Sequence, residues 1–332
     1  IHLSAVYNNE SWRYLYSKQI GMDKMLDLNW ERYTPVIDLE IDEVKKIFLE
    51  YDKTIKVSEF HAIQLGCKNR NYIVRTSKGK FILRLTDLTG FNNELAVYRL
   101  VNGRINVPGL LFHTTQNGRN IFIYQYINGV SLQKHIVENK QCDLSLLEQV
   151  AKTAALIHNT PKEKAIKLPA FDVPPYEVWY ESFLNHPVVR AKLGEKTRER
   201  ILRLVFDKQD FIAEIDGLKS LIHCDFRPAN MLANEENQVF FVDWEGAWWG
   251  HTIADIGTFF RFRSFFDDEH IRLFEETYHS FAENRLPDHW FELSLFRDLV
   301  NPLQLLSSKQ EAPLRDADLI HVIEGILAYW GY

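Results

Sequence analysis

The segment His223-Cys224-Asp225-Phe226-Arg227-Pro228-Ala229-Asn230 follows the short apolar run Leu221-Ile222. Its aspartate and asparagine lie five residues apart, and a second aspartate, in Val242-Asp243-Trp244-Glu245, comes thirteen residues after Asn230. Short apolar runs on both sides of the polar residues 234–237 predict a hairpin between the two motifs. The sequence therefore predicts a strand, a loop carrying a carboxylate and an amide, and a hairpin that ends in another carboxylate.

These three side chains match the requirements of phosphoryl transfer to a hydroxyl. That reaction needs a carboxylate that orients the hydroxyl and accepts its proton, together with oxygen ligands for Mg²⁺. Asp225, Asn230 and Asp243 have the right types and order for these roles. A single Asp or Asn on a turn usually caps a helix or closes an Asx-turn, but the combination of spacing, hairpin and apolar-Asp ending favours the functional interpretation.

The rest of the chain predicts two lobes. Strands at 61–65, 71–76 and 80–85, a helix at 91–101 and strands at 110–115 and 120–126 give the order three strands, one helix, two strands. After a short connector at 126–129, helical patterns dominate, beginning with a helix at 144–158. The predicted class is α+β, with an N-terminal extension (1–35), a small β-rich nucleotide-binding N-lobe (36–127) and a larger helical C-lobe (128–332) for catalysis and substrate binding.

With these motifs the chain resembles the aminoglycoside phosphotransferase/choline kinase-like family, which are small-molecule kinases of bilobal, protein-kinase-like fold. The resemblance covers residues 57–265 and includes Ala254-Asp255-Ile256-Gly257. It implies that Asp225 is the catalytic base and that Asn230 and Asp243 hold the metal. It also implies that His223 and Asp255 support the catalytic loop.

The N-lobe supplies candidates for nucleotide binding. Arg84 occupies the strand on which kinases carry a lysine against the phosphates, and arginine keeps the charge and can bind phosphate bidentately; an arginine on the solvent face of a strand is the alternative. Glu94 is its expected partner. Gly66 marks the expected phosphate-covering loop, which has a single glycine. Gln125 and Tyr126 mark the expected hinge that meets the purine, although tyrosines there also suit packing between lobes.

Charge is distributed unevenly along the chain. The net charge is −6, but residues 223–332 contain 19 acidic side chains against 8 Lys and Arg, a balance of −11, so residues 1–222 carry +5. This asymmetry favours an anionic cosubstrate on one side and a cationic acceptor on the other. Asp267, Asp268 and Glu269, with Trp248 as an aromatic wall, are the candidate acceptor site. A solvated acidic helix face and a core tryptophan are the alternatives.

Composition excludes several classes of protein. A pI near 6.1 argues against a nucleic-acid-binding protein, and the longest uncharged runs, 105–118 and 120–133, are too short and polar to span a bilayer. Three scattered cysteines without a C-x-x-C pair predict neither a disulfide scaffold nor a cysteine zinc site. With no secretory signal pattern, the expected location is the cytoplasm.

The leading hypothesis is a Mg²⁺-dependent phosphotransferase. It would move the γ-phosphate of ATP or GTP to a hydroxyl of a small, cationic molecule such as an amino-sugar antibiotic or an amino alcohol. The alternative is a catalytically idle kinase-like protein that binds a ligand or acts as a scaffold, which loss of Asp225, Asn230 or Asp243 would favour. A protein kinase is disfavoured, because Asp243-Trp244-Glu245 stands in place of D-F-G and no A-P-E segment follows.

Overall fold

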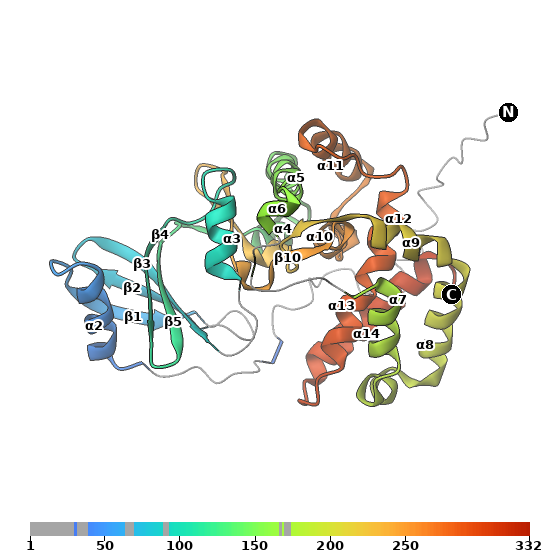
Figure 1. The fold of residues 1–332 in the computed structure, drawn as a ribbon, viewed down its shortest axis with the longest axis horizontal. Helices are drawn as coiled ribbons and strands as arrows, with labels where there is room; N and C mark the ends of the chain where they lie inside the picture. The colour runs from blue at the N-terminus through green and yellow to red at the C-terminus, as the bar shows by residue number, and fades with distance from the viewer. Residues whose placement is uncertain (1–29, 32–38, 64–69, 89–92, 166–167, 169–173) are drawn as a thin grey trace.

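The computed structural model describes residues 30–31, 39–63, 70–88, 93–165, 168 and 174–332. Figure 1 shows a small lobe built on a twisted sheet at the left and a larger, mainly helical lobe at the right. Helix α3 (Glu94–Val101) lies between the sheet and the helical lobe.

The small lobe is a five-stranded antiparallel sheet in the order β1-β2-β3-β5-β4. Its remaining elements are α2 (Ile41–Tyr51), β1 (Val57–Ala62), β2 (Arg70–Thr76), β3 (Gly79–Asp87), β4 (Leu110–Gln116) and β5 (Arg119–Gln125). The β4–β5 hairpin turns through Asn117 and Gly118, which have positive φ angles of 51° and 73°. Positive φ at both positions is what a two-residue turn between twisted strands requires, and Asn-Gly provides it at low cost.

The alternation of side chains along β3 separates the two faces of the sheet. Leu83 and Leu85 point into a core with Val44 and Phe48 of α2. Because neighbouring residues of a strand face opposite sides, Arg84 points to the other face, where α3 supplies Glu94. The pleat of one strand thus directs a buried cation toward the space between the lobes.

Short strands connect the lobes and carry the catalytic motif. The strands β6 (Gly129–Ser131), β8 (Met231–Asn234) and β9 (Val239–Phe241) form one sheet, while β7 (Lys219–Ile222) pairs with β10 (Trp248–His251). A side chain at Gly129 would place its Cβ 2.2 Å from the carbonyl oxygen of Ala233, so only glycine permits β6 to approach β8 so closely.

The large lobe is helical around a single extensive apolar core. Its helices are α4 (Leu132–Asn139), α5 (Leu144–His158), α6 (Lys162–Ala165), α7 (Tyr176–Leu184), α8 (Pro187–Asp207), α9 (Gln209–Gly217), α10 (Ile253–Phe259), α11 (Asp268–Phe281), α12 (Trp290–Asp298), α13 (Val300–Leu306) and α14 (Pro313–Tyr329). A Cβ on Gly257 of α10 would lie 2.3 Å from the carbonyl oxygen of Ser294 in α12. This close packing holds α10, and with it Asp255, beneath the catalytic loop.

The predicted α+β class with a small sheet lobe and a larger helical lobe is confirmed, as is the order of strands and helix in the N-lobe. Three details differ. The first strand covers 57–62, whereas it was predicted at 61–65, of which 64–65 lie outside the described residues. The helix begins at Glu94, and β6 and β10 were not predicted. Strands of three or four residues are too short to show an alternating pattern.

Among the described residues, no helix has the length and apolar character needed to cross a bilayer.

Candidate active site

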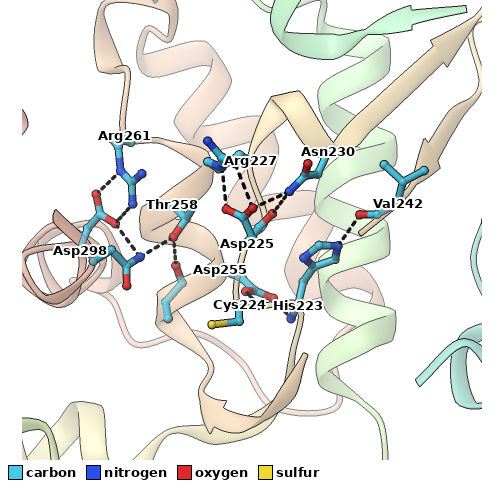
Figure 2. A network of polar contacts seen from close by, with 12 residues as sticks. His223, Cys224, Asp225, Arg227, Asn230, Val242, Asp255, Thr258, Arg261 and Asp298 are labelled. Carbon is cyan, nitrogen blue, oxygen red and sulfur yellow. Dashed lines mark hydrogen bonds and ion pairs between the residues drawn. The ribbon is translucent and has the colours of Figure 1, made fainter. Parts of the chain in front are cut away.

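The catalytic loop joins the end of β7 to the start of β8 and is held from below by Asp255. This carboxylate is fully buried and accepts the backbone N–H groups of His223 (2.8 Å) and Cys224 (2.9 Å) on its two oxygens. Cys224 has a φ of +70°, a conformation that costs a non-glycine residue energy. The two hydrogen bonds to Asp255 stabilise this bend, which presents Asp225 at the top of the loop (Figure 2).

His223 connects the loop to the strand that leads to Asp243. Its Nε2 lies 2.9 Å from the carbonyl oxygen of Val242 and donates the hydrogen, since a carbonyl can only accept. The imidazole packs on Trp244 with 4.4 Å between ring centroids. His223 therefore links the catalytic loop to the strand that leads to Asp243.

Asp225 is the acidic residue of the catalytic loop, and 42% of its side chain is exposed. Nε of Arg227 donates to its Oδ1 (2.6 Å) and Nη2 of Arg227 to its Oδ2 (3.0 Å), while Nδ2 of Asn230 donates to Oδ2 (2.8 Å). Burial opposes ionisation, but the Arg227 charge and these hydrogen bonds hold the pKa of Asp225 at about 2. Asp225 is thus an oriented, ionised carboxylate at physiological pH, which can accept a hydrogen bond from a hydroxyl group.

Asn230 and Asp243 are brought together by the β8–β9 hairpin. Met231 pairs with Phe241, and the next bond runs from the N–H of Val242 to the carbonyl oxygen of Asn230 (3.0 Å). Asp243 follows directly, with φ of +71°. The amide nitrogen of Asn230 is used on Asp225, so its amide oxygen points away from that carboxylate. One carboxylate and one amide oxygen on a fixed hairpin fit Mg²⁺, which takes few protein ligands and completes its shell with phosphates and water.

In the part of the chain that the structure describes, no group of three or more His, Cys, Asp or Glu side chains is arranged to hold a metal ion.

Arg84 reaches from the small lobe to the Asp243 motif. Its Nε donates to Glu94 (2.8 Å), and its Nη2 donates to Asp243 (2.6 Å) and more distantly to Glu245 (3.4 Å). The side chains of Arg84 and Glu94 are only 6% and 4% exposed. Burial opposes the charge of Arg84, but the three carboxylates around it raise its pKa. The alternative of an arginine on the solvent face of a strand is wrong.

Two further residues fix the inter-lobe cluster of Arg84, Glu94, Asp243 and Glu245. The hydroxyl of Tyr124 donates to the second oxygen of Glu94 (2.8 Å). Asn93, which precedes α3, donates its backbone N–H to the carbonyl oxygen of Glu245 (3.1 Å) and its amide to that of Ala247 (2.7 Å). Helix α3 is therefore anchored to the large lobe at its first turn, and Arg84 is placed beside the candidate metal ligand.

The other predicted nucleotide-binding residues lie at the end of β5, in the connector that follows it, or outside the described residues. Gly66 falls in the segment 64–69, which lies outside them. Gln125 ends β5, with its backbone N–H bound to Gly109 and its side chain exposed. Tyr126 follows at the connector between the lobes, under the ammonium group of Lys80, 5.1 Å from the ring centroid. Their contact with a purine remains a prediction.

The predicted acceptor residues lie in the large lobe. Trp248 packs edge-on against Trp179, with 5.7 Å between the ring centroids, and this contact fits the alternative that Trp248 is a packing residue. Asp267 is the N-cap of α11: its Oδ1 accepts the backbone N–H of Glu269 (3.0 Å) and lies 2.6 Å from Nδ1 of His270. Asp268 and Glu269 are exposed. Asp267 therefore has a structural task, and the role of this cluster in acceptor binding remains a prediction.

Sequence reasoning missed four residues of the site. Arg227 and Glu245 stand inside the quoted motifs but were given no role. Tyr124 directly precedes the expected hinge residues Gln125 and Tyr126, and its contact with Glu94 was not predicted. His158, at the end of α5, lies 3.4 Å from Asp255 through Nε2 and 2.8 Å from the Tyr278 hydroxyl through Nδ1. No local signal identifies His158, because its partners are 97 and 120 residues away.

Comparisons with known proteins bear on the family and the fold of the chain. The model of the phosphotransferase enzyme family matches residues 59–292. The choline kinase of Streptococcus pneumoniae is 17% identical, with a TM-score of 0.62 over 86% of this chain and 100% of that one. A spectinomycin phosphotransferase solved with ADP and spectinomycin is 16% identical, with a TM-score of 0.65 over 88% and 99%.

A third solved structure, the macrolide 2′-phosphotransferase of Brachybacterium faecium, is 16% identical, with a TM-score of 0.58 over 85% of this chain and 98% of that one. At these identities the likeness establishes the shared bilobal, protein-kinase-like fold. No match was found among curated protein sequences.

Proposed function

The chain belongs to the phosphotransferase enzyme family, and we propose that it uses ATP or GTP, with Mg²⁺, to phosphorylate a hydroxyl group of a small cationic molecule. The observation that carries this proposal is the arrangement of Asp225, Asn230 and Asp243 on one rigid loop and hairpin, with Arg84 beside Asp243. The ADP and AMP held by solved neighbours support a nucleotide cosubstrate.

Each residue has a defined task in the proposed reaction. Asp225, ionised and exposed, orients the acceptor hydroxyl and takes its proton. The amide oxygen of Asn230 and the carboxylate of Asp243 would hold Mg²⁺, which neutralises charge on the β- and γ-phosphates when bound. Arg84, fixed by Glu94, would contact the phosphates from the small lobe. Asp255 and His223 keep the loop in shape.

The first test is a screen for nucleotide consumption. The purified protein is incubated with Mg²⁺ and ATP or GTP, against panels of amino alcohols, aminoglycosides, macrolides and sugars. We expect acceptor-dependent release of nucleoside diphosphate. Nucleotide binding without turnover on any panel would favour the idle kinase-like alternative, and absence of nucleotide binding would contradict the proposed function altogether.

Changing Asp243 tests the metal site. In the Asp243→Ala variant we expect Mg²⁺-dependent nucleotide binding to be lost, because the carboxylate ligand is gone. Asp243→Asn is the matched control for structure, since it keeps an oxygen that can accept from Arg84 but removes the charge that attracts the metal. Calorimetry should show weak, Mg²⁺-insensitive nucleotide binding in both. Unchanged affinity for the Mg-nucleotide complex in either variant would contradict the assignment.

A cationic acceptor is supported by the charge of the large lobe. Residues 223–332 carry −11, and several of the arginines there are already engaged: Arg227 on Asp225, Arg261 on Asp298 and Arg315 on Asp316. The acidic excess therefore lies outside these pairs, with Asp268 and Glu269 exposed at the start of α11. A negative field of this kind concentrates cations near the site.

Ionic strength tests the charge of the acceptor. Between about 10 mM and 300 mM salt the Debye length falls from roughly 30 Å to below 8 Å, so KM for the true acceptor should rise clearly. The double variant Asp268→Asn/Glu269→Gln should raise KM at low salt, whereas Glu283→Gln/Asp288→Asn, an equal charge change at exposed positions on another segment, should not. A neutral acceptor with a salt-insensitive KM would contradict the cationic proposal and leave the kinase assignment unaffected.

A further inference from the structure

Arg227 is the residue that touches the candidate base yet has no assigned task. Its guanidinium binds both oxygens of Asp225, at 2.6 Å and 3.0 Å, and 23% of its side chain is exposed. Figure 2 shows the two side chains pointing toward one another from the same loop. The backbone closes this loop tightly, because the N–H of Arg227 binds the carbonyl of Asp225 (2.8 Å) and the N–H of Asn230 binds that of Arg227 (2.9 Å).

The position of Asp225 places Arg227 near the reacting atoms. The acceptor oxygen must lie within hydrogen-bond distance of the Asp225 carboxylate, and a phosphorus atom poised for attack lies about 3–3.5 Å from that oxygen. A guanidinium in direct contact with the same carboxylate is then within a few ångströms of the transferring phosphoryl group. Arg227 is thus a cation located where negative charge passes from one oxygen to another.

Building on the proposed function, we propose that Arg227 is a catalytic residue that donates hydrogen bonds to the phosphoryl group during transfer. An oxygen lone pair of the acceptor hydroxyl forms the new bond to the γ-phosphorus. The bond between that phosphorus and the β–γ bridging oxygen breaks, and its electron pair stays on the nucleoside diphosphate. The hydroxyl proton passes to Asp225, and the Arg227 guanidinium stabilises the charge on the phosphoryl oxygens.

Arginine suits this task because it is a planar group with five N–H donors, so it can bind a carboxylate on one edge and a phosphoryl oxygen on another. The neighbouring Arg261 binds a carboxylate with the same two nitrogens but is more deeply buried. Its Nε and Nη2 bind Asp298 at 2.9 Å and 2.7 Å, and its side chain is 5% exposed, against 23% for Arg227. Figure 2 shows this pair beside the Arg227–Asp225 pair. Exposure of the side chain, and not the pattern of its bonds, therefore distinguishes Arg227 from Arg261.

Binding of a phosphoryl-transfer mimic separates this role from a structural one. Calorimetry compares the affinity for Mg-ADP alone with the affinity for Mg-ADP plus aluminium fluoride, which imitates the phosphoryl group in transfer. In the wild-type protein we expect tighter binding with aluminium fluoride. Arg227→Gln should bind Mg-ADP as the wild type does, but the ratio of its affinities with and without aluminium fluoride should be at least tenfold smaller than in the wild type. Arg227→Lys, which keeps the charge, should show an intermediate ratio.

Turnover in two backgrounds completes the test. Arg227→Gln should lower kcat by about 10²–10³-fold. Arginines that stabilise a transferring phosphoryl group contribute about 10³–10⁵-fold to kcat, so the expected loss lies at the lower end of their effect. Placed in the Asp225→Asn background, it should lower the residual rate further. A full aluminium fluoride gain in Arg227→Gln, or no added loss in the double variant, would show that Arg227 acts only by positioning Asp225 and would overturn the proposal. Failure of the wild type to bind Mg-nucleotide would instead overturn the proposed function and this inference with it.

Discussion

Replacing Asp225 by Asn should lower kcat by about 10²–10⁴-fold, the usual effect of removing a general base. The side chain accepts hydrogen bonds from Arg227 and Asn230 and has a pKa of about 2, so it is available as a carboxylate throughout the neutral range. Asparagine keeps the shape but cannot take a proton. Affinity for nucleotide should change little, because in the proposed reaction Asp225 contacts the acceptor hydroxyl.

The measurement combines steady-state kinetics on the acceptor found in the screen with calorimetry on Mg-ADP. Asp288→Asn, the same substitution at an exposed position, is the matched control and should leave both quantities unchanged. If Asp225→Asn kept more than about a tenth of the wild-type kcat, Asp225 would not be the base. A large loss of Mg-ADP affinity would point instead to a role in holding the nucleotide.

The part of the site that sequence could predict is the part made of local contacts. Asp225 and Asn230 are five residues apart, and backbone hydrogen bonds close the loop between them. The spacing in the sequence is therefore enough to specify how the two side chains lie relative to one another. Asp243 is placed by a hairpin with a short polar turn, which also has a clear sequence pattern. In the same way, the predicted strands 110–115 and 120–126 lie on either side of Asn117-Gly118, a local signal for the β4–β5 hairpin.

Contacts between distant segments could not be predicted in this way. Arg84 meets Asp243 across 159 residues, and nothing in either motif says that the guanidinium reaches the other lobe. His158 is similarly far from Asp255. The segment of Trp248 forms β10 and pairs with β7, with Trp248 opposite Ile222, and this strand was not predicted. A four-residue strand has too few positions to show its period, so only the tertiary structure identifies it.

Replacing Arg84 by Met should destabilise the protein by about 3–5 kcal/mol, the usual cost of removing one partner from a buried ion pair. Methionine is close to arginine in length but leaves Glu94, which is 4% exposed, without the cation beside it. Burial already raises the pKa of Glu94, and Asp243 and Glu245 raise it further, while the Arg84 charge opposes that rise. Without Arg84, three carboxylates would repel one another at the junction of the lobes.

An arginine on the neighbouring strand supplies the matched control. Arg75 of β2 binds Glu59 at 2.9 Å, but the two side chains are 54% and 47% exposed, and exposed ion pairs contribute at most about 1 kcal/mol. Urea unfolding should therefore separate Arg84→Met from Arg75→Met by several kcal/mol. Arg84→Lys should fall between them, because an ammonium group keeps the charge but cannot span Glu94 and Asp243 with separate nitrogens. Equal losses in Arg84→Met and Arg75→Met would mean that Arg84 does not hold the lobes together, and its role would then be confined to phosphate binding.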